Sequence, residues 1–98
     1  MMMCGGFTEL RDADDKCKEV ANSVKDKVEE QLNQKFTVYE PIKFATQVVA
    51  GANYMIKIKV DDNKYIHIKV FVPLPHTKKP NQLSKCEGGK TLEDALKP

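Results

Sequence analysis

The sequence has no tryptophan, and among its 98 residues only three are cysteine, five proline and five glycine. It lacks an apolar run of membrane-spanning length, and its first residues lack the basic segment and apolar stretch of a signal peptide, so neither a membrane partner nor export is expected. The formal net charge is only +2, with basic and acidic residues interspersed, so no nucleic-acid partner is expected. A chain of this length builds one core, so residues 1–98 are predicted to form a single domain.

The three cysteines, Cys4, Cys17 and Cys86, are an odd number without paired spacing. Without an export signal they predict reduced thiols in the cytoplasm, with an intermolecular disulfide through Cys4 as an open alternative. No cysteine or histidine has a neighbour at ligand spacing, and the glycines before Lys90 lack the rest of a phosphate-binding loop. The sequence therefore predicts neither a metal site nor a cofactor.

A long amphipathic helix is predicted for residues 12–34. Residues 7–40 contain neither glycine nor proline, and apolar side chains recur there every three or four positions. The apolar stripe consists of Ala13, Cys17, Val20, Ala21, Val24, Val28 and Leu32. Asp12 is the predicted N-cap, followed by acidic residues that suit the positive end of the helix dipole. Residues 1–11 show no periodicity and are predicted to be a flexible arm.

After the helix the hydrophobic period changes to two, which is the period of a β-strand. Strands are predicted at residues 36–44, 53–60 and 64–72, with a bulge or edge position at Pro41 and a tight turn between the last two. In each strand apolar residues alternate with a second set of residues, and in the strand at residues 64–72 this second set includes His67. The pattern predicts an antiparallel sheet with one apolar face and one largely wet face, on which His67 is solvated.

The remaining chain holds a proline-rich loop and one more strand. Residues 73–81 contain three prolines and are predicted to be a loop, residues 82–86 a strand, and residues 87–90 a turn. One helix followed by antiparallel strands predicts an α+β architecture, with the helix packed across the apolar face of the sheet.

The chain must reverse direction around Gln47–Gly51, where two valines stand beside an Ala-Gly step. We predict that both valines point beyond the sheet; the alternative is that they pack inward behind a short turn. In a meander alternate connections lie at the same end of the sheet. This reversal should therefore neighbour Leu74–His76, with the turn at residues 61–63 at the opposite end.

Taken singly, these segments have ordinary explanations. Pro75-His76 would be a rigid solvated loop, and Gly5-Gly6 would belong to a loose terminus. Taken together, two loops at one edge and a glycine-containing arm could form a continuous ridge. Such a ridge could fill a groove in a partner protein, and it is a poor shape for a catalytic site.

The three segments together resemble those of a known family. The sequence looks like a stefin, one of the intracellular, disulfide-free cystatins that inhibit papain-like cysteine proteases. The resemblance rests on "QVVAG" at residues 47–51, the glycine in "MCGG" at residues 3–6, and "LPH" at residues 74–76. The start and "LPH" look more like the B-type stefins than the A-type. The resemblance implies a five-stranded antiparallel sheet wrapped around one long α-helix.

The resemblance also implies a tripartite wedge that enters the protease cleft. The arm would follow the non-primed side, the first loop would cover the catalytic centre, and the second loop would reach the primed side. The residues carried over are Met3, Cys4 and Gly5, with Gly6 as the alternative glycine; Gln47, Val48, Val49, Ala50 and Gly51; and Leu74, Pro75 and His76. The chain departs from the family in its non-aromatic tail, in "CEGGK", and in the basic residues Lys78 and Lys79.

The function implied is reversible, tight-binding, competitive inhibition of papain-like cysteine proteases of the cathepsin type. An enzyme is not expected, because the sequence has only two histidines and no Ser-His-Asp set. One alternative is an interaction domain of the same fold that inhibits no protease. The protein is expected to be a monomer, and a domain-swapped dimer that opens at the first loop is the alternative state.

Overall fold

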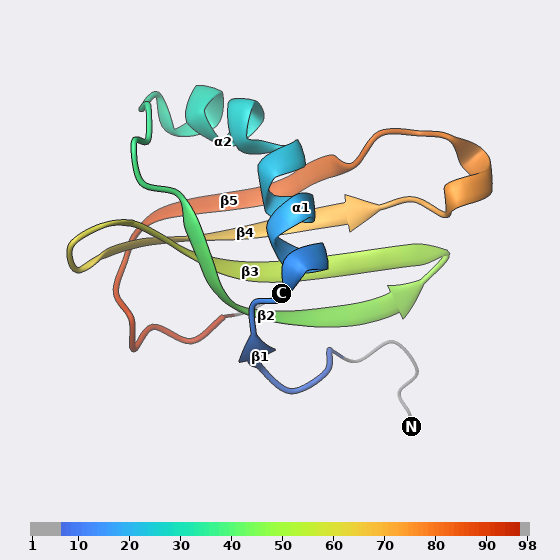
Figure 1. Cartoon of the computed structure of the whole chain (residues 1–98), viewed down its shortest axis with the longest axis horizontal. Coiled ribbons are helices and arrows are strands. Elements are labelled where there is room, and N and C mark those ends of the chain that lie inside the picture. Colours follow the sequence, from blue (N-terminus) through green and yellow to red (C-terminus); the bar gives the residue numbers. More distant parts are fainter. Residues whose placement is uncertain (1–6, 97–98) are drawn as a thin grey trace.

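The computed structural model of the protein describes residues 7–96 (Figure 1). Its centre is one antiparallel sheet in which the strands follow one another in chain order. The strands are β1 (Arg11–Asp12), β2 (Glu40–Val49), β3 (Gly51–Asp61), β4 (Lys64–Val72) and β5 (Gln82–Lys90). Helical segments lie across one face of this sheet, which confirms the predicted α+β architecture with five strands.

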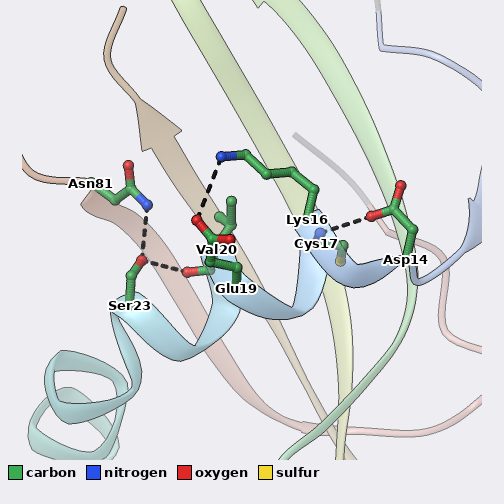
Figure 2. A network of polar contacts seen from close by, with 7 residues as sticks. All are labelled: Asp14, Lys16, Cys17, Glu19, Val20, Ser23 and Asn81. Carbon is green, nitrogen blue, oxygen red and sulfur yellow. Dashed lines mark hydrogen bonds and ion pairs between the residues drawn. The ribbon is translucent and has the colours of Figure 1, made fainter. Parts of the chain in front are cut away.

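The helix has two parts, α1 (Asp15–Ser23) and α2 (Lys25–Leu32), which meet at Val24. The backbone at Val24 leaves the helical region, with φ −116° and ψ 9°. Immediately before it, the hydroxyl of Ser23 donates a hydrogen bond of 2.6 Å to the carbonyl of Val20 (Figure 2). Such back-bonding competes with the helical ladder and bends helices. The predicted long helix is therefore present with a break in its middle.

The helix starts later than the sequence suggested. Asp14, not Asp12, is the N-cap, and its carboxylate accepts a 2.8 Å hydrogen bond from the N–H of Cys17 (Figure 2). Asp12 instead belongs to β1, and its carboxylate binds the ammonium of Lys43 on β2. The prediction failed because three aspartates close together each have the side chain of a cap.

The core fills the space between the helical segments and the inner face of the sheet. Most of the helical stripe and the alternating apolar residues of β3 and β4 form one buried cluster, as predicted, but β2 contributes only Phe44, because Val38 precedes β2 and is exposed. Its members are Cys17, Val20, Ala21, Val24, Val28, Phe36, Phe44, Ile56, Ile58, Ile66, Ile68 and Val70. Burying each large aliphatic side chain is worth about 1.5–3 kcal/mol, so this cluster dominates the stability of the fold.

Two strand boundaries differ from the sequence prediction. Phe36 is buried but lies ahead of β2, where its N–H donates a 2.9 Å hydrogen bond to the carboxylate of Glu29 on α2. The "EGGK" segment, predicted to be a turn, is the second half of β5. Irregular register between β4 and β5 accommodates its two glycines. The bulge expected at Pro41 is confirmed, because the register of β2 against β3 shifts between Pro41 and Lys43.

The outer face of the sheet is not the wet face that the alternation predicted. Met55 and Lys57 on β3, and Tyr65 and His67 on β4, are all buried there. The segment after β5 covers part of this face, and the ammonium of Lys57 donates hydrogen bonds to the carbonyls of Leu92 and Asp94. The prediction that His67 is solvated is therefore wrong.

The described helices are short and carry many charged residues. No helix within residues 7–96 is long and apolar enough to cross a membrane.

Candidate functional site

The first candidate segment is the hairpin between β2 and β3. The two strands pair up to Val49 and Gly51, which leaves Ala50 alone at the tip. The side chain of Val48 is 78% exposed and that of Val49 is 41% exposed. Both valines therefore face away from the core, and the alternative that they pack inward is excluded. A pair of exposed β-branched residues at a strand end is a small apolar patch of the kind that marks interaction surfaces.

Gly51 fixes the position of this hairpin against β4. Its φ is +121°, a conformation that residues with a side chain rarely adopt. A Cβ atom at this position would lie 2.5 Å from the carbonyl oxygen of Val72 and 3.1 Å from the ring of Phe71. The hairpin tip thus approaches the end of β4 as closely as a bare backbone allows.

The second candidate segment begins where β4 ends. Leu74 and Pro75 are exposed, and Pro75–Thr77 form a single 3-10 turn. Both the N–H and the hydroxyl of Thr77 donate to the carbonyl of Leu74, at 3.0 and 2.7 Å. The N–H of Lys78 closes the turn on the carbonyl of Pro75 at 3.2 Å. These local bonds hold Leu74, Pro75 and His76 in one conformation.

The second segment is also tied to the helix. The side-chain amide of Asn81 donates a 2.9 Å hydrogen bond to the hydroxyl of Ser23, at the break between α1 and α2 (Figure 2). The two residues are 58 positions apart, so no local pattern in the sequence could have indicated this contact.

The two loops lie at the same end of the sheet, as the meander argument predicted. Figure 1 shows the β2–β3 hairpin and the β4–β5 loop at the right, and the β3–β4 turn at the left. The register agrees, because Ala52 pairs with Val72 near both loops, whereas Asp61 pairs with Lys64 at the far end.

The N-terminal candidates Met3, Cys4, Gly5 and Gly6 lie outside the described residues. The chain just after them runs along β2. The N–H of Thr8 donates to the carbonyl of Thr46 at 2.8 Å, and the N–H of Thr46 donates to the hydroxyl of Thr8 at 3.1 Å. This pairing, which sequence reasoning missed, ties the described end of the predicted flexible arm to β2 and continues the antiparallel direction of β1.

Gln47 supports the hairpin from the side. Its side-chain carbonyl accepts a 2.8 Å hydrogen bond from the amide of Asn53, its partner on β3. The bond links the two strands just below the exposed valines. It therefore favours a single hairpin conformation over a splayed one.

The described thiols are placed for packing and not for chemistry. Burial raises the pKa of Cys17 to about 12 and that of Cys86 to about 11, so both stay protonated at neutral pH. Within residues 7–96, no three His, Cys, Asp or Glu side chains gather into a group that could hold a metal ion.

Comparison with known proteins gives the family. A cystatin domain model matches residues 5–93. The chain is 44% identical over 92 residues to stefin-C of Bos taurus, covering 94% of this chain and 91% of the relative. It is 41% identical over 95 residues to cystatin-B of Bos taurus, covering 97% of each chain. It is 44% identical over 95 residues to leukocyte cysteine proteinase inhibitor 1 of Sus scrofa, covering 97% of this chain and 92% of the relative.

A sheet wrapped on a helix with two loops at one end, together with these matches, defines the class. The chain belongs to the cystatin family and is of the stefin type within it. Cystatins are protease inhibitors and not enzymes, so membership removes the enzyme alternative.

Proposed function

We propose that the protein is a reversible, tight-binding, competitive inhibitor of papain-like cysteine proteases of the cathepsin type. The observation that carries the proposal is the exposure of Val48 and Val49 on one loop and of Leu74 on the other, because both loops lie at the same end of the sheet. A relative named cysteine proteinase inhibitor, at 44% identity, supports the same activity.

The apolar tips supply binding energy. Full burial of an exposed aliphatic side chain is worth about 1.5–3 kcal/mol, so Val48, which is 78% exposed, gains the most from an apolar cleft, and Val49 and Leu74, which are 41% and 40% exposed, gain less. Nanomolar affinity needs a net free energy of about −12 kcal/mol, so the cost of ordering the loops must be low. The hydrogen bonds within the Leu74–Lys78 turn and across the Gln47–Asn53 pair keep that cost low, because they fix both loops before binding.

The inhibitor would block the cleft without being cut. In this proposal Gln47–Gly51 covers the catalytic centre, Leu74–His76 lies on the primed side, and Met3–Gly6 follow the non-primed side. A glycine near the catalytic thiol allows close backbone approach, and cleavage is avoided when the carbonyl misses near-attack geometry. His76 would pack and donate hydrogen bonds, without acting as a base.

Titration of papain with the purified protein tests the proposal. We expect stoichiometric loss of activity that substrate reverses competitively. Val49→Asp should raise the inhibition constant about 10- to 100-fold, chiefly through faster dissociation, because it places a charge in the apolar contact.

The chain offers a matched control in Val38, which is also 41% exposed but precedes β2 at the opposite end of the sheet. Val38→Asp should leave inhibition unchanged. Equal effects of the two substitutions would contradict the placement of the hairpin in the cleft. No inhibition by the parent would favour the alternative of a cystatin-fold interaction domain.

The arm and the oligomeric state need separate assays. Gly5→Arg should weaken inhibition by orders of magnitude without changing thermal unfolding.

We propose that the active species is a cytoplasmic monomer, because a swapped dimer would straighten Gln47–Gly51 into a longer strand and hide the wedge. Inhibition assays on separated monomer and dimer fractions distinguish the two.

A further inference from the structure

The two loops carry charge of only one sign. Residues 46–53 contain no charged side chain, and residues 73–81 contain only Lys78 and Lys79. Both lysines are exposed, and within the described chain neither ammonium lies at ion-pair distance from a carboxylate. The opposite end of the sheet is mixed, because its turn holds Asp61 and Asp62 beside Lys64.

Lys78 also occupies an unfavourable backbone conformation. Its φ is +54°, in the left-handed region. Within residues 7–96 the other residues with a side chain and a positive φ are Asn33 and Asn63, and asparagine is the type that tolerates this region best. The fold alone would thus be served better by asparagine than by lysine at this position. Strained residues of this kind cluster at functional sites.

The loop holds the two lysines in a defined place. The N–H of Lys78 is bonded to the carbonyl of Pro75, and the N–H of Lys79 lies 3.5 Å from the hydroxyl of Thr77. Two residues further on, the amide of Asn81 anchors the loop to Ser23 on the helix (Figure 2). The ammonium groups are therefore presented from a fixed backbone beside the exposed Leu74.

We propose that Lys78 and Lys79 form a cationic rim on the second loop, which pairs with carboxylates bordering the primed side of the target cleft. The inference rests on the proposed function, since it presumes that this loop enters a papain-like protease. The rim selects proteases whose primed-side border carries Asp or Glu and speeds their association. Charges at the rim of an interface act mainly on the association rate and its salt dependence.

The test compares Lys78→Asn and Lys79→Gln, singly and together, with Lys64→Asn. The control removes one charge, as each single substitution does, from an exposed lysine at the opposite end of the sheet. The probes are a papain-like protease with acidic residues on its primed-side border and a variant of that protease in which those residues are amides. Association rates are measured from about 10 mM salt, where the Debye length is about 30 Å, to about 0.5 M salt.

With the acidic protease, we expect the double substitution to slow association about 3- to 10-fold at low salt and to flatten the salt dependence. With the amide protease, the parent and the double variant should associate at equal rates. Lys64→Asn should behave like the parent with both. Lys78→Asn should also raise the melting temperature by about 2–4 °C, because asparagine relieves the left-handed residue, so slower binding cannot reflect a damaged fold.

The outcomes separate the two proposals. Inhibition of both proteases with unchanged association by the double variant overturns the rim and leaves the inhibitor intact. Equal slowing with the acidic and the amide protease overturns the pairing with carboxylates. Inhibition of neither protease by the parent overturns the proposed function and the rim with it.

Discussion

Neighbouring residues of one strand are buried equally well on the two faces of the sheet, but different parts of the chain cover the two faces. On β3, Ile56 and Ile58 face the helices and are fully buried, while Met55 and Lys57 face the other way and are 4% and 5% exposed. The inner cover consists of helical side chains, and part of the outer cover is the irregular segment after β5. A buried position is thus no proof of an apolar core.

The outer face buries the polar side chains of Lys57 and His67, whereas the core cluster on the inner face is apolar. The ammonium of Lys57 lies 2.6 Å from the carbonyl oxygen of Asp94 and also binds that of Leu92. Beside it, Nε2 of His67 is buried and, within the described residues, has no hydrogen-bond partner. Burial, followed by the charges of Lys57 and Lys90, lowers the pKa of His67 to about 4.

Truncating a core residue should show the largest difference between the faces. Ile56→Ala should lower the free energy of unfolding by about 4 kcal/mol, because it leaves a cavity in close-packed surroundings. Met55→Ala should cost about half as much, since the outer cover is irregular and can collapse onto the gap. Urea unfolding of both variants measures the difference, and equal losses would mean that the two covers are equally rigid.

The second-largest expected difference between the faces is the loss of stability at acid pH, which should come from the outer face. The pKa of His67 is about 4 in the folded protein and about 6.5 when unfolded, so below pH 6.5 the unfolded chain binds the extra proton. Stability is therefore lost as the pH falls from about 6.5 to about 4, by up to about 3 kcal/mol. The groups that face His67 are Lys57 and Lys90, which favour the loss, and Asp94 and Glu87, which oppose it. His67→Gln should abolish this slope; a slope unchanged in the variant would assign it to other groups.

The smallest expected effect concerns the outer cover alone. Lys57→Met keeps the length of the side chain but removes both bonds to the carbonyls, and we expect a loss of about 1 kcal/mol or less in global stability. Amide hydrogen exchange in residues 91–96 should accelerate at least tenfold, while α1 stays protected.

Lys59→Met is the matched control for that experiment, because Lys59 shares the strand and the face but, among residues 7–96, has no bond to the segment after β5. Similar exchange in the two variants would show that Lys57 does not hold the segment.

The inner face could be read from the sequence, and the outer cover could not. A period of two on three strands and a period near 3.6 on the helix identify nearly every core residue, because both faces of that interface are apolar. The segment at residues 91–96 has no periodicity, and Lys57 binds it through main-chain oxygens, which every residue possesses. Nothing in the residue types could therefore indicate this contact.

In the candidate site too, some features could be predicted from the sequence and others could not. The positions of both loops followed from strand order, and the exposure of Val48 and Val49 followed from their place at a strand end. The bond between Asn81 and Ser23 joins distant polar residues without a local pattern. The break at Val24 was likewise unpredictable, because neither glycine nor proline marks it.

The hydrogen bonds of Lys57 to main-chain oxygens have a practical consequence for fluorescent labelling. Leu92 exposes half of its side chain, and it lines a shared hollow with Asn63 and Tyr65 near the β3–β4 turn, far from the two loops. Because Lys57 holds Leu92 through its carbonyl, which every residue possesses, a fluorescent amino acid can replace Leu92 without breaking the attachment. A dye there would report on encounters at the other end of the molecule without standing in their way.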